Sequence, residues 1–294
     1  MRVLVTGAGG MLGRDLVDML AGHPEHTVTA ATRAEVDITD ADAVHAAVAG
    51  HDVVVNAAAW TDVDAAEQHE AAATAVNGDA VTNIARSCAV HGARLIQLST
   101  DYVLAGDATA PYREDTPTAP VNAYGRGKLV GEQAVIRLLP DAGYVVRTAW
   151  LYGTHGRNFV TTVLGLAERR EFLDVVDDQR GQPTWSYALA HRLVALAEAA
   201  TAGRAAPGVY HGTCSGETTW YELTRAVFAL RGLDPNRVRP TTSARFPRPA
   251  PRPAYSVLGH GRWAAAGLPP LPDWHATLVD AFASPAPPSP GKVA

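Results

Sequence analysis

The sequence predicts an α/β fold built on a doubly wound parallel sheet, with a smaller C-terminal substrate-binding part. Two observations predict this fold. Short runs rich in β-branched residues alternate with longer Ala-rich segments through the first 150 residues, and a glycine-rich stretch follows the first run. Because connections between parallel strands are almost always right-handed, this alternation places helices on both faces of one sheet.

The elements of the first half follow from the spacing of apolar residues. The runs that indicate buried strands are 2–6, 27–31, 52–56, 93–99 and 144–148. Helical spacing between them predicts helices over 11–21, 40–49, 70–91 and 123–139. Thr39 is the predicted N-cap of the second helix, with Asp40 and Asp42 in its first turn.

Beyond residue 150 the alternation is less regular. It predicts helices over 158–168, 187–199, 219–231 and 273–283, and a strand over 172–176. The Pro-rich stretch 239–256 is expected to be a long irregular loop, and such loops are usually functional or linkers. The last residues, 285–294, are predicted to be disordered from their Pro- and Ser-rich composition.

Composition narrows the class of protein. The chain has 294 residues, of which 47% are hydrophobic and 19% charged, and a net charge of −5. That is enough chain to bury a large core, and the interspersed charges favour neither nucleic acid nor an anionic membrane as a partner. No apolar run reaches transmembrane length, and the first ten residues lack the apolar core of a signal peptide. We therefore expect a soluble cytoplasmic protein.

Metal and disulfide chemistry is not indicated. The two cysteines, Cys88 and Cys214, form no motif, and the 11 histidines include no HExxH pattern, so no metal is assigned. The sequence leaves the oligomeric state open, and a homodimer is compatible with it.

The stretch TGAGGMLG links the first predicted strand to the first helix. Gly7, Gly10 and Gly13 fit GxxGxxG. They do not fit GxGxxG, because Leu12 stands where that motif has its third glycine. The same physics applies, since glycines permit a tight turn and helix N-terminal amides face an anionic pyrophosphate. In this strand–loop–helix context the stretch predicts a dinucleotide site. The expected division is a Rossmann dinucleotide-binding domain over 1–150 and a substrate-binding part over 151–284, which returns to the sheet.

The end of the second strand favours NADPH over NADH. A ribose 2′-hydroxyl is usually bound by an acid at this point, but the stretch AATRAEVD has none there. Arg33 lies close by, and an arginine suits a 2′-phosphate. The alternative cofactor is NADH. The alternative role of Arg33 is that of a solvated charge on a loop.

Tyr124 and Lys128 are four residues apart at the start of a predicted helix, on one face. Lys128 is one of only two lysines in the chain, the other being Lys292. An ammonium about 6 Å from a phenol is expected to lower the tyrosine pKa by about two units, toward neutral pH. Such a phenol can exchange a proton with a carbonyl oxygen. Lys128 can also hydrogen-bond a ribose.

With these motifs the sequence resembles the extended short-chain dehydrogenase/reductases, and within them the dTDP-4-dehydrorhamnose reductase family. The resemblance covers about residues 1–284. Its motifs include TGAGGMLG, VVNAAAWTDVDAAE, LSTDYVLAG, PVNAYGRGKLVGE and DDQRGQPTW. It implies NAD(P)H-dependent reduction of the C4 ketone of dTDP-6-deoxy-L-lyxo-4-hexulose to dTDP-L-rhamnose.

The resemblance also implies roles for matched residues. Thr100, Tyr124 and Lys128 would form the catalytic triad. The implied cofactor residues are Gly10, Met11 and Leu12 at the pyrophosphate, Asp37 and Ile38 at the adenine, and Ala57, Ala58 and Ala59 beside the ribose. The implied sugar-binding residues are Thr100, Asp101 and Trp150.

The residues themselves agree with part of this assignment. Thr100 follows the fourth strand and Trp150 the fifth, at the edge where open parallel sheets bind ligands. Arg252 is a candidate diphosphate partner, because a fork of donors suits phosphate oxygens. The structural alternatives are a helix or turn cap for Thr100, a turn residue for Asp101 and a core aromatic for Trp150.

Trp60, Leu104 and Ala105 depart from the family pattern at the sugar end, which leaves the exact sugar open. A reductase for another dTDP-4-keto-6-deoxysugar, as in antibiotic pathways, is one alternative. A second is a non-catalytic NADP-binding regulatory subunit, against which the intact Thr100, Tyr124 and Lys128 argue. A third is an epimerase or 4,6-dehydratase. A dehydratase would usually have Glu where Tyr102 stands.

Overall fold

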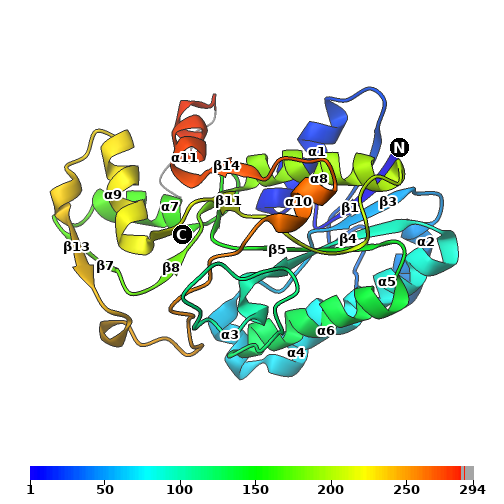
Figure 1. The fold of residues 1–294 in the computed structure, drawn as a ribbon, viewed down its shortest axis with the longest axis horizontal. Coiled ribbons are helices and arrows are strands. Elements are labelled where there is room, and N and C mark those ends of the chain that lie inside the picture. Colours follow the sequence, from blue (N-terminus) through cyan, green and yellow to red (C-terminus); the bar gives the residue numbers. More distant parts are fainter. Residues whose placement is uncertain (286–287, 289–294) are drawn as a thin grey trace.

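The computed structural model describes residues 1–285 and 288 and confirms the predicted α/β class. Its centre is a six-stranded, wholly parallel sheet in the order β10-β5-β4-β3-β1-β2 (Figure 1). These strands are β1 (Arg2–Thr6), β2 (Thr27–Ala31), β3 (Val53–Asn56), β4 (Arg94–Thr100), β5 (Gly143–Thr148) and β10 (Gly208–His211).

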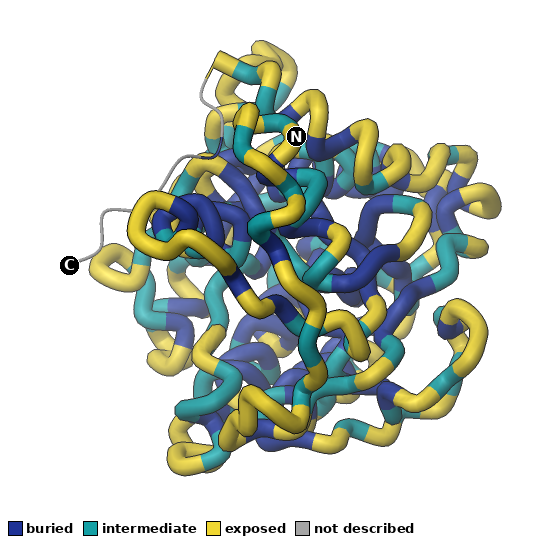
Figure 2. Tube along the Cα trace, turned by 90° about the vertical axis from the view of Figure 1, so that its left-hand side faces the viewer, coloured by how far each residue is buried: buried dark blue, intermediate teal, exposed yellow. Residues whose placement is uncertain are grey.

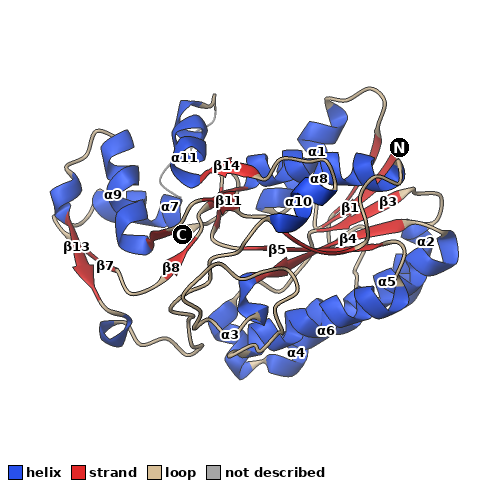
Figure 3. Ribbon diagram, in the orientation of Figure 1, coloured by secondary structure: helices blue, strands red, loops and turns tan. Residues whose placement is uncertain are grey.

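Helices cover both faces of this sheet (Figures 1 and 3). One face is covered by α1 (Met11–Ala21) and α8 (Ser186–Thr201), and the other by α2 (Ala41–Val48), α5 (Ala80–His91) and α6 (Ala123–Leu138). Side chains alternate along a strand, so Val3 and Val5 join the first core while Leu4 joins the second. Fully burying each such side chain contributes about 1.5–3 kcal/mol.

The segment predicted as one helix over 70–91 is a helix with a π-helical turn inside it. It consists of α4 (Glu70–Thr74), the π turn η1 (Ala75–Asp79) and α5. A short helix that the sequence did not predict, α3 (Val63–Gln68), precedes it, and the side chain of Asp62 caps its N-terminus.

The rest of the chain builds a smaller layer beside the carboxyl end of the sheet. Its helices are α7 (Phe159–Ala167), α9 (Trp220–Leu230) and α11 (Trp274–Ala283), whereas α10 (Gly261–Ala265) packs Trp263 into the core beneath α8, beside β10. Its strands are β6 (Leu151–Tyr152), β7 (Leu173–Val176), β8 (Arg180–Gly181), β9 (Thr184–Trp185), β11 (Cys214–Ser215), β12 (Thr218–Thr219), β13 (Val238–Thr241) and β14 (Leu271–Asp273). A separate core joins α7, α9 and α11. Figure 2 shows, along the whole chain, that exposed turns lie on the outside and buried stretches lie inside.

Three sequence predictions need correction. β2 is the edge strand of the sheet, so Thr27, Thr29 and Ala30 are exposed rather than buried. The N-cap of α2 is Asp40 and not Thr39, because the Asp40 carboxylate accepts the amides of residues 42 and 43. The stretch 239–256 is not wholly irregular, since its first residues continue β13, which pairs with β7.

The predicted disordered tail, 285–294, lies almost entirely outside the described residues. Within the part of the chain that the structure describes, no helix has the length and apolar character needed to cross a membrane.

Candidate active site

A cavity of about 700 Å³ lies at the carboxyl edge of the sheet. It runs from the loop after β2, past the glycine loop, to the start of α6. All thirteen residues predicted to bind the cofactor line it: Gly7, Gly10, Met11, Leu12, Gly13, Arg33, Asp37, Ile38, Ala57, Ala58, Ala59, Tyr124 and Lys128. The fold thus brings together segments that are more than 100 residues apart in the chain.

The glycine loop packs closely against the loop after β3. Gly7 has a φ of +69°, and a Cβ there would lie 2.5 Å from the amide nitrogen of Ala58. A Cβ on Gly13 would overlap the carbonyl oxygen of Gly7. Gly10 is the N-cap of α1 and offers no side chain to the first-turn amides. Because these amides lack a side-chain cap and face the cavity, they can bind an anionic group.

A buried polar network, which the sequence did not reveal, fixes the loop after β3. Thr6 donates a 2.6 Å hydrogen bond to Asn56 Oδ1, and Asn56 Nδ2 donates to Gln97 at 2.7 Å. The amide of Ala58 donates to the same Asn56 Oδ1 at 3.1 Å. The network joins β1, β3 and β4, so the alanines that line the cavity rest on three strands.

At the outer end of the cavity, the two carboxylates that follow β2, those of Glu35 and Asp37, already accept hydrogen bonds. The Glu35 carboxylate accepts hydrogen bonds from the amide and hydroxyl of Thr32, both at 2.7 Å. Arg33 lies at the rim with its side chain 88% exposed, 3.7 Å from Asp37. Asp37 also accepts from Thr39, and these hydrogen bonds lower its pKa. Arg33 is therefore an exposed cation in the wall at the outer end of the cavity.

At the inner end, Thr100 connects Tyr124 to Asp101. The Thr100 hydroxyl donates to Asp101 Oδ1 at 2.8 Å and accepts the amide of Tyr102 at 3.2 Å. It also interacts with Tyr124 and acts to lower the pKa of that phenol. Thr100 thus also caps a short 3₁₀ turn, and a cap is the structural alternative that the sequence offered for it. Asp101 is buried, which raises its pKa to about 6, while bonds from Ser256 and Thr100 oppose the shift.

The expected lowering of the Tyr124 pKa is wrong. Burial of the phenol raises its pKa above the usual range, the Asp101 carboxylate raises it further, and the hydrogen bond with Thr100 lowers it only in part. Lys128 is itself buried and donates a 2.6 Å hydrogen bond to the carbonyl of Leu98. Burial lowers the lysine pKa to about 8, against the opposing charge of Glu132.

Two hydroxyls lining this inner end have no partner in the described structure. Ser99 Oγ and Thr148 Oγ1 are buried without a hydrogen bond, and both line the cavity with Tyr124 and Lys128. Buried polar atoms normally find partners, so these two indicate a polar ligand at this point. With the first-turn amides of α1 at the middle of the cavity, they fit the polar groups of a nicotinamide dinucleotide.

The predicted substrate residues lie outside the cavity wall. Thr100 and Asp101 are buried behind Tyr124. Trp150 has a φ of +48° and stacks on Trp220, with ring centroids 3.5 Å apart and planes at 11°. Arg252 forms a 3.0 Å ion pair with Asp64 of α3. The structure therefore places these four residues next to the cofactor cavity rather than in it.

Sequence reasoning missed several residues of the cavity wall. They include Thr32, Val36, Thr39, Thr61, Val76, Leu98, Ser99, Thr148, Leu151, Gly156 and Arg157. Ser99 and Thr148 could have been found, because each ends a predicted strand at the ligand-binding edge. Trp60, noted only as a departure from the family pattern, also lines the wall and packs against the same alanine cluster as Tyr124.

Known proteins match the chain along its whole described length. The model of the RmlD substrate binding domain family matches residues 1–285. The dTDP-4-dehydrorhamnose reductase of Streptomyces griseus is 54% identical, over 96% of this chain and 93% of the relative. The dTDP-4-keto-6-deoxy-D-glucose reductase of Streptomyces niveus is 52% identical, over 96% of both chains.

Solved structures agree with the sequence relatives. A dTDP-4-dehydrorhamnose reductase from Clostridium acetobutylicum superposes with a TM-score of 0.90 at 37% identity, covering 95% of this chain and 98% of that one. The enzyme from Bacillus anthracis, solved in complex with NADP, has a TM-score of 0.88 at 33% identity, covering 96% and 98%.

The parallel sheet, with its glycine loop and the cavity at its carboxyl edge, defines a Rossmann-fold protein similar to solved reductases. Within that class, the chain belongs to the RmlD substrate binding domain family.

Proposed function

We propose that this protein is an NADPH-dependent oxidoreductase that reduces the C4 ketone of dTDP-6-deoxy-L-lyxo-4-hexulose to dTDP-L-rhamnose. The observation that carries the proposal is the 54% identity with the Streptomyces griseus dTDP-4-dehydrorhamnose reductase over 96% of the chain. The NADP complex of the Bacillus anthracis relative supports the cofactor. NADH remains the weaker alternative, because no acid is free at the end of β2.

NADPH, when bound, supplies the hydride that C4 of the sugar receives. Tyr124 donates its phenolic proton to the ketone oxygen, which becomes a hydroxyl. With its raised pKa the phenol is protonated at neutral pH, so Tyr124 carries the proton that the ketone oxygen receives. Thr100, which interacts with Tyr124, orients the phenol and the carbonyl. Lys128 holds the ribose with the donors that its bond to Leu98 leaves free.

The proposal includes the predicted division of labour along the chain. Residues 1–150 mainly bind the dinucleotide, and 151–284 mainly bind the nucleotide sugar and return to the sheet through β10. Asp101, Trp150 and Arg252 belong to the sugar side in this proposal. Arg33 binds the 2′-phosphate, and the residues of the glycine loop bind the pyrophosphate.

We also propose a cytoplasmic location and a homodimer. Exposed apolar side chains on α5 and α6, including Val90 (71% exposed) and Ile136 (49% exposed), support a second copy on that face. Light scattering of the purified protein measures the mass in solution, and a monomer at all concentrations would remove the homodimer from the proposal.

Product analysis tests the proposed function. The purified protein is incubated with dTDP-4-keto-6-deoxyglucose, a 3,5-epimerase and NADPH, and the nucleotide sugar is identified. We expect dTDP-L-rhamnose, with one NADPH oxidised per sugar. Turnover without added cofactor and without net oxidation would instead indicate an epimerase or dehydratase. Nucleotide binding without turnover would indicate the regulatory subunit.

The Streptomyces niveus relative favours a second candidate, a reductase that acts on the sugar without prior epimerisation. The same incubation without the 3,5-epimerase separates the two. Reduction at full rate in its absence identifies the second candidate.

A further inference from the structure

The segment Phe246–Ala254 has the sequence FPRPAPRPA, in which every second residue from 247 to 253 is proline. Proline has no amide hydrogen and fixes its own φ, so this segment is stiff and has few backbone donors. Only the residues between the prolines can donate a backbone hydrogen bond. The segment therefore needs specific partners to hold it against the rest of the fold.

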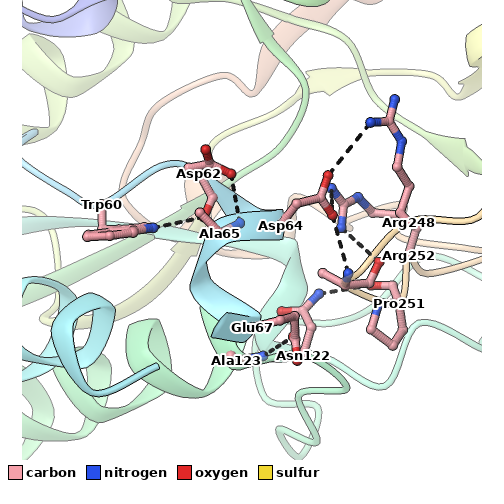
Figure 4. Close-up of polar contacts among 11 residues, drawn as sticks. Trp60, Asp62, Asp64, Ala65, Glu67, Asn122, Ala123, Arg248, Pro251 and Arg252 are labelled. Carbon is pink, nitrogen blue, oxygen red and sulfur yellow. Dashed lines mark hydrogen bonds and ion pairs between the residues drawn. The ribbon is translucent and has the colours of Figure 1, made fainter. Parts of the chain in front are cut away.

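Asp64 is the main partner of this segment. One of its carboxylate oxygens accepts the amide of Ala250 at 3.2 Å and lies 3.0 Å from the Arg252 guanidinium. Its other oxygen lies 3.8 Å from Arg248. Figure 4 shows both arginines beside Asp64 at the start of α3. A single carboxylate thus holds both the backbone and a side chain of the proline-rich segment.

Asn122 holds the same segment from the other side. It is fully buried, and its Oδ1 accepts the amide of Gly125, which caps the helix that carries Tyr124. Its Nδ2 donates a 3.0 Å hydrogen bond to the carbonyl of Pro251, directly before Arg252 (Figure 4). One amide side chain therefore fixes the position of α6 relative to Arg252.

Arg252 is held in place with donors to spare. Its side chain is 20% exposed, donates to the carbonyl of Ala250 at 2.9 Å and pairs with Asp64. A guanidinium has five N–H donors, so these two contacts leave three for a ligand. Its carbon lies 6.0 Å from the Tyr102 ring, which packs edge-on against Tyr124 with centroids 6.1 Å apart. One aromatic side chain therefore separates Arg252 from the proposed proton donor.

We propose that Asp64 and Asn122 are positioning residues that hold Arg252 ready for the diphosphate of the nucleotide sugar, at a fixed distance from Tyr124. This inference rests on the proposed function, because it takes a nucleotide diphosphate as the ligand. A preset arginine binds phosphate oxygens without first being ordered, which lowers the entropic cost of binding. The charge of Asp64 also keeps the partly buried guanidinium paired before the ligand arrives.

Binding of dTDP, measured by calorimetry on the full chain with NADPH present, tests the proposal without turnover. We expect Arg252→Ala to weaken dTDP about tenfold or more, as loss of charge-assisted hydrogen bonds does. Asp64→Ala should weaken it about as much, and Asp64→Asn, which keeps an acceptor, should recover most of the loss. Asn122→Asp keeps the helix cap but loses the donor to Pro251, and should weaken dTDP several-fold. NADPH affinity and the unfolding midpoint check that each variant is folded.

A double-mutant cycle and a matched control make the result specific. Adding Asp64→Ala to Arg252→Ala should weaken dTDP binding by less than a further twofold, because Asp64 acts through that arginine. Arg248→Ala removes an arginine with the same partner but a side chain 63% exposed, and should leave dTDP affinity unchanged. Tighter dTDP binding in Asp64→Ala, additive losses in the double variant, or an equal loss in Arg248→Ala would each overturn the proposal.

Failure of the proposed function would look different. If the wild-type protein binds dTDP but does not reduce the 4-keto sugar, the function is wrong while the binding cycle still decides the roles of Asp64 and Asn122. If the wild-type protein does not bind dTDP, the proposed function and the proposed roles of Asp64 and Asn122 are both wrong.

Discussion

Lys128 donates a 2.6 Å hydrogen bond from Nζ to the carbonyl oxygen of Leu98, in the interior of the protein. The Leu98 carbonyl has a second donor, the side-chain amide of Gln97 at 2.8 Å. The lysine is therefore not needed to satisfy this carbonyl. It is a buried cation in a position where a neutral side chain would be less costly for folding.

Lys128→Met is expected to make the protein more stable at pH 7 and inactive. The folded-state pKa of about 8 lies below the ordinary value of 10.5, so the unfolded chain binds more protons between these two pH values. Wild-type stability therefore rises with pH across that window, and the full penalty, about 3 kcal/mol, applies below it. Urea unfolding at pH 7 and pH 10 measures the difference. A gain that does not shrink at the higher pH would contradict the assignment.

Asp101→Asn is expected to stabilise the protein at neutral pH. Here the folded-state pKa, about 6, is above the ordinary value of 3.8, so the folded chain binds more protons between these values. Wild-type stability falls as the pH rises through this window, by about 3 kcal/mol in full. Asparagine keeps an acceptor for Thr100. Unfolding at pH 7 should show the gain, and unfolding at pH 4 should show little of it.

Tyr124→Phe is expected to lower turnover about 10²–10⁴-fold, the usual contribution of general acid catalysis. The ring remains, so NADPH affinity should stay within about twofold. Single-turnover oxidation of NADPH measures the chemical step. Tyr187→Phe, at an exposed tyrosine on α8, is the matched control. Turnover near that of the wild type would identify another group as the proton donor.

Arg33→Ala is expected to weaken NADPH about tenfold or more and to leave NADH nearly unchanged. The side chain is 88% exposed, so stability should not change. Fluorescence titration with each cofactor gives the two affinities. Arg157→Ala is the control, since that exposed arginine lines the same cavity from another loop. An equal loss of affinity for both cofactors would indicate that Arg33 is a solvated charge on the loop and binds no 2′-phosphate.

Much of the fold could be predicted because its signals are local. The apolar spacing of 11–21 matches the bounds of α1, and the runs of β1 and β2 match theirs, since periodicity and β-branched residues are visible in a single segment. The short strand β10 was not assigned. Its four residues, GVYH, begin with a glycine and end with a histidine and so do not form a run of β-branched residues, and only its pairing with β5 makes it a strand.

The site was predictable in position but not in electrostatics. Helical spacing placed Tyr124 next to Lys128, and strand ends placed Thr100 at the same edge. The direction of the Tyr124 pKa depends on burial and on Asp101, which reach the phenol through tertiary packing. The engagement of Arg252 by Asp64 joins residues almost 190 positions apart, so no local pattern reveals it.

The return of β10 to the sheet has a consequence for the growing chain on the ribosome. β5 ends at Thr148 and its neighbour β10 begins at Gly208, so about 60 further residues must be made before that edge is paired. At about 5–20 residues per second, this takes roughly 3–12 seconds. During that interval β5 exposes a row of free amides and carbonyls, which is the surface on which unfinished chains join edge to edge. Synthesis of residues 149–207 thus sets how long this edge of the main sheet stays unpaired.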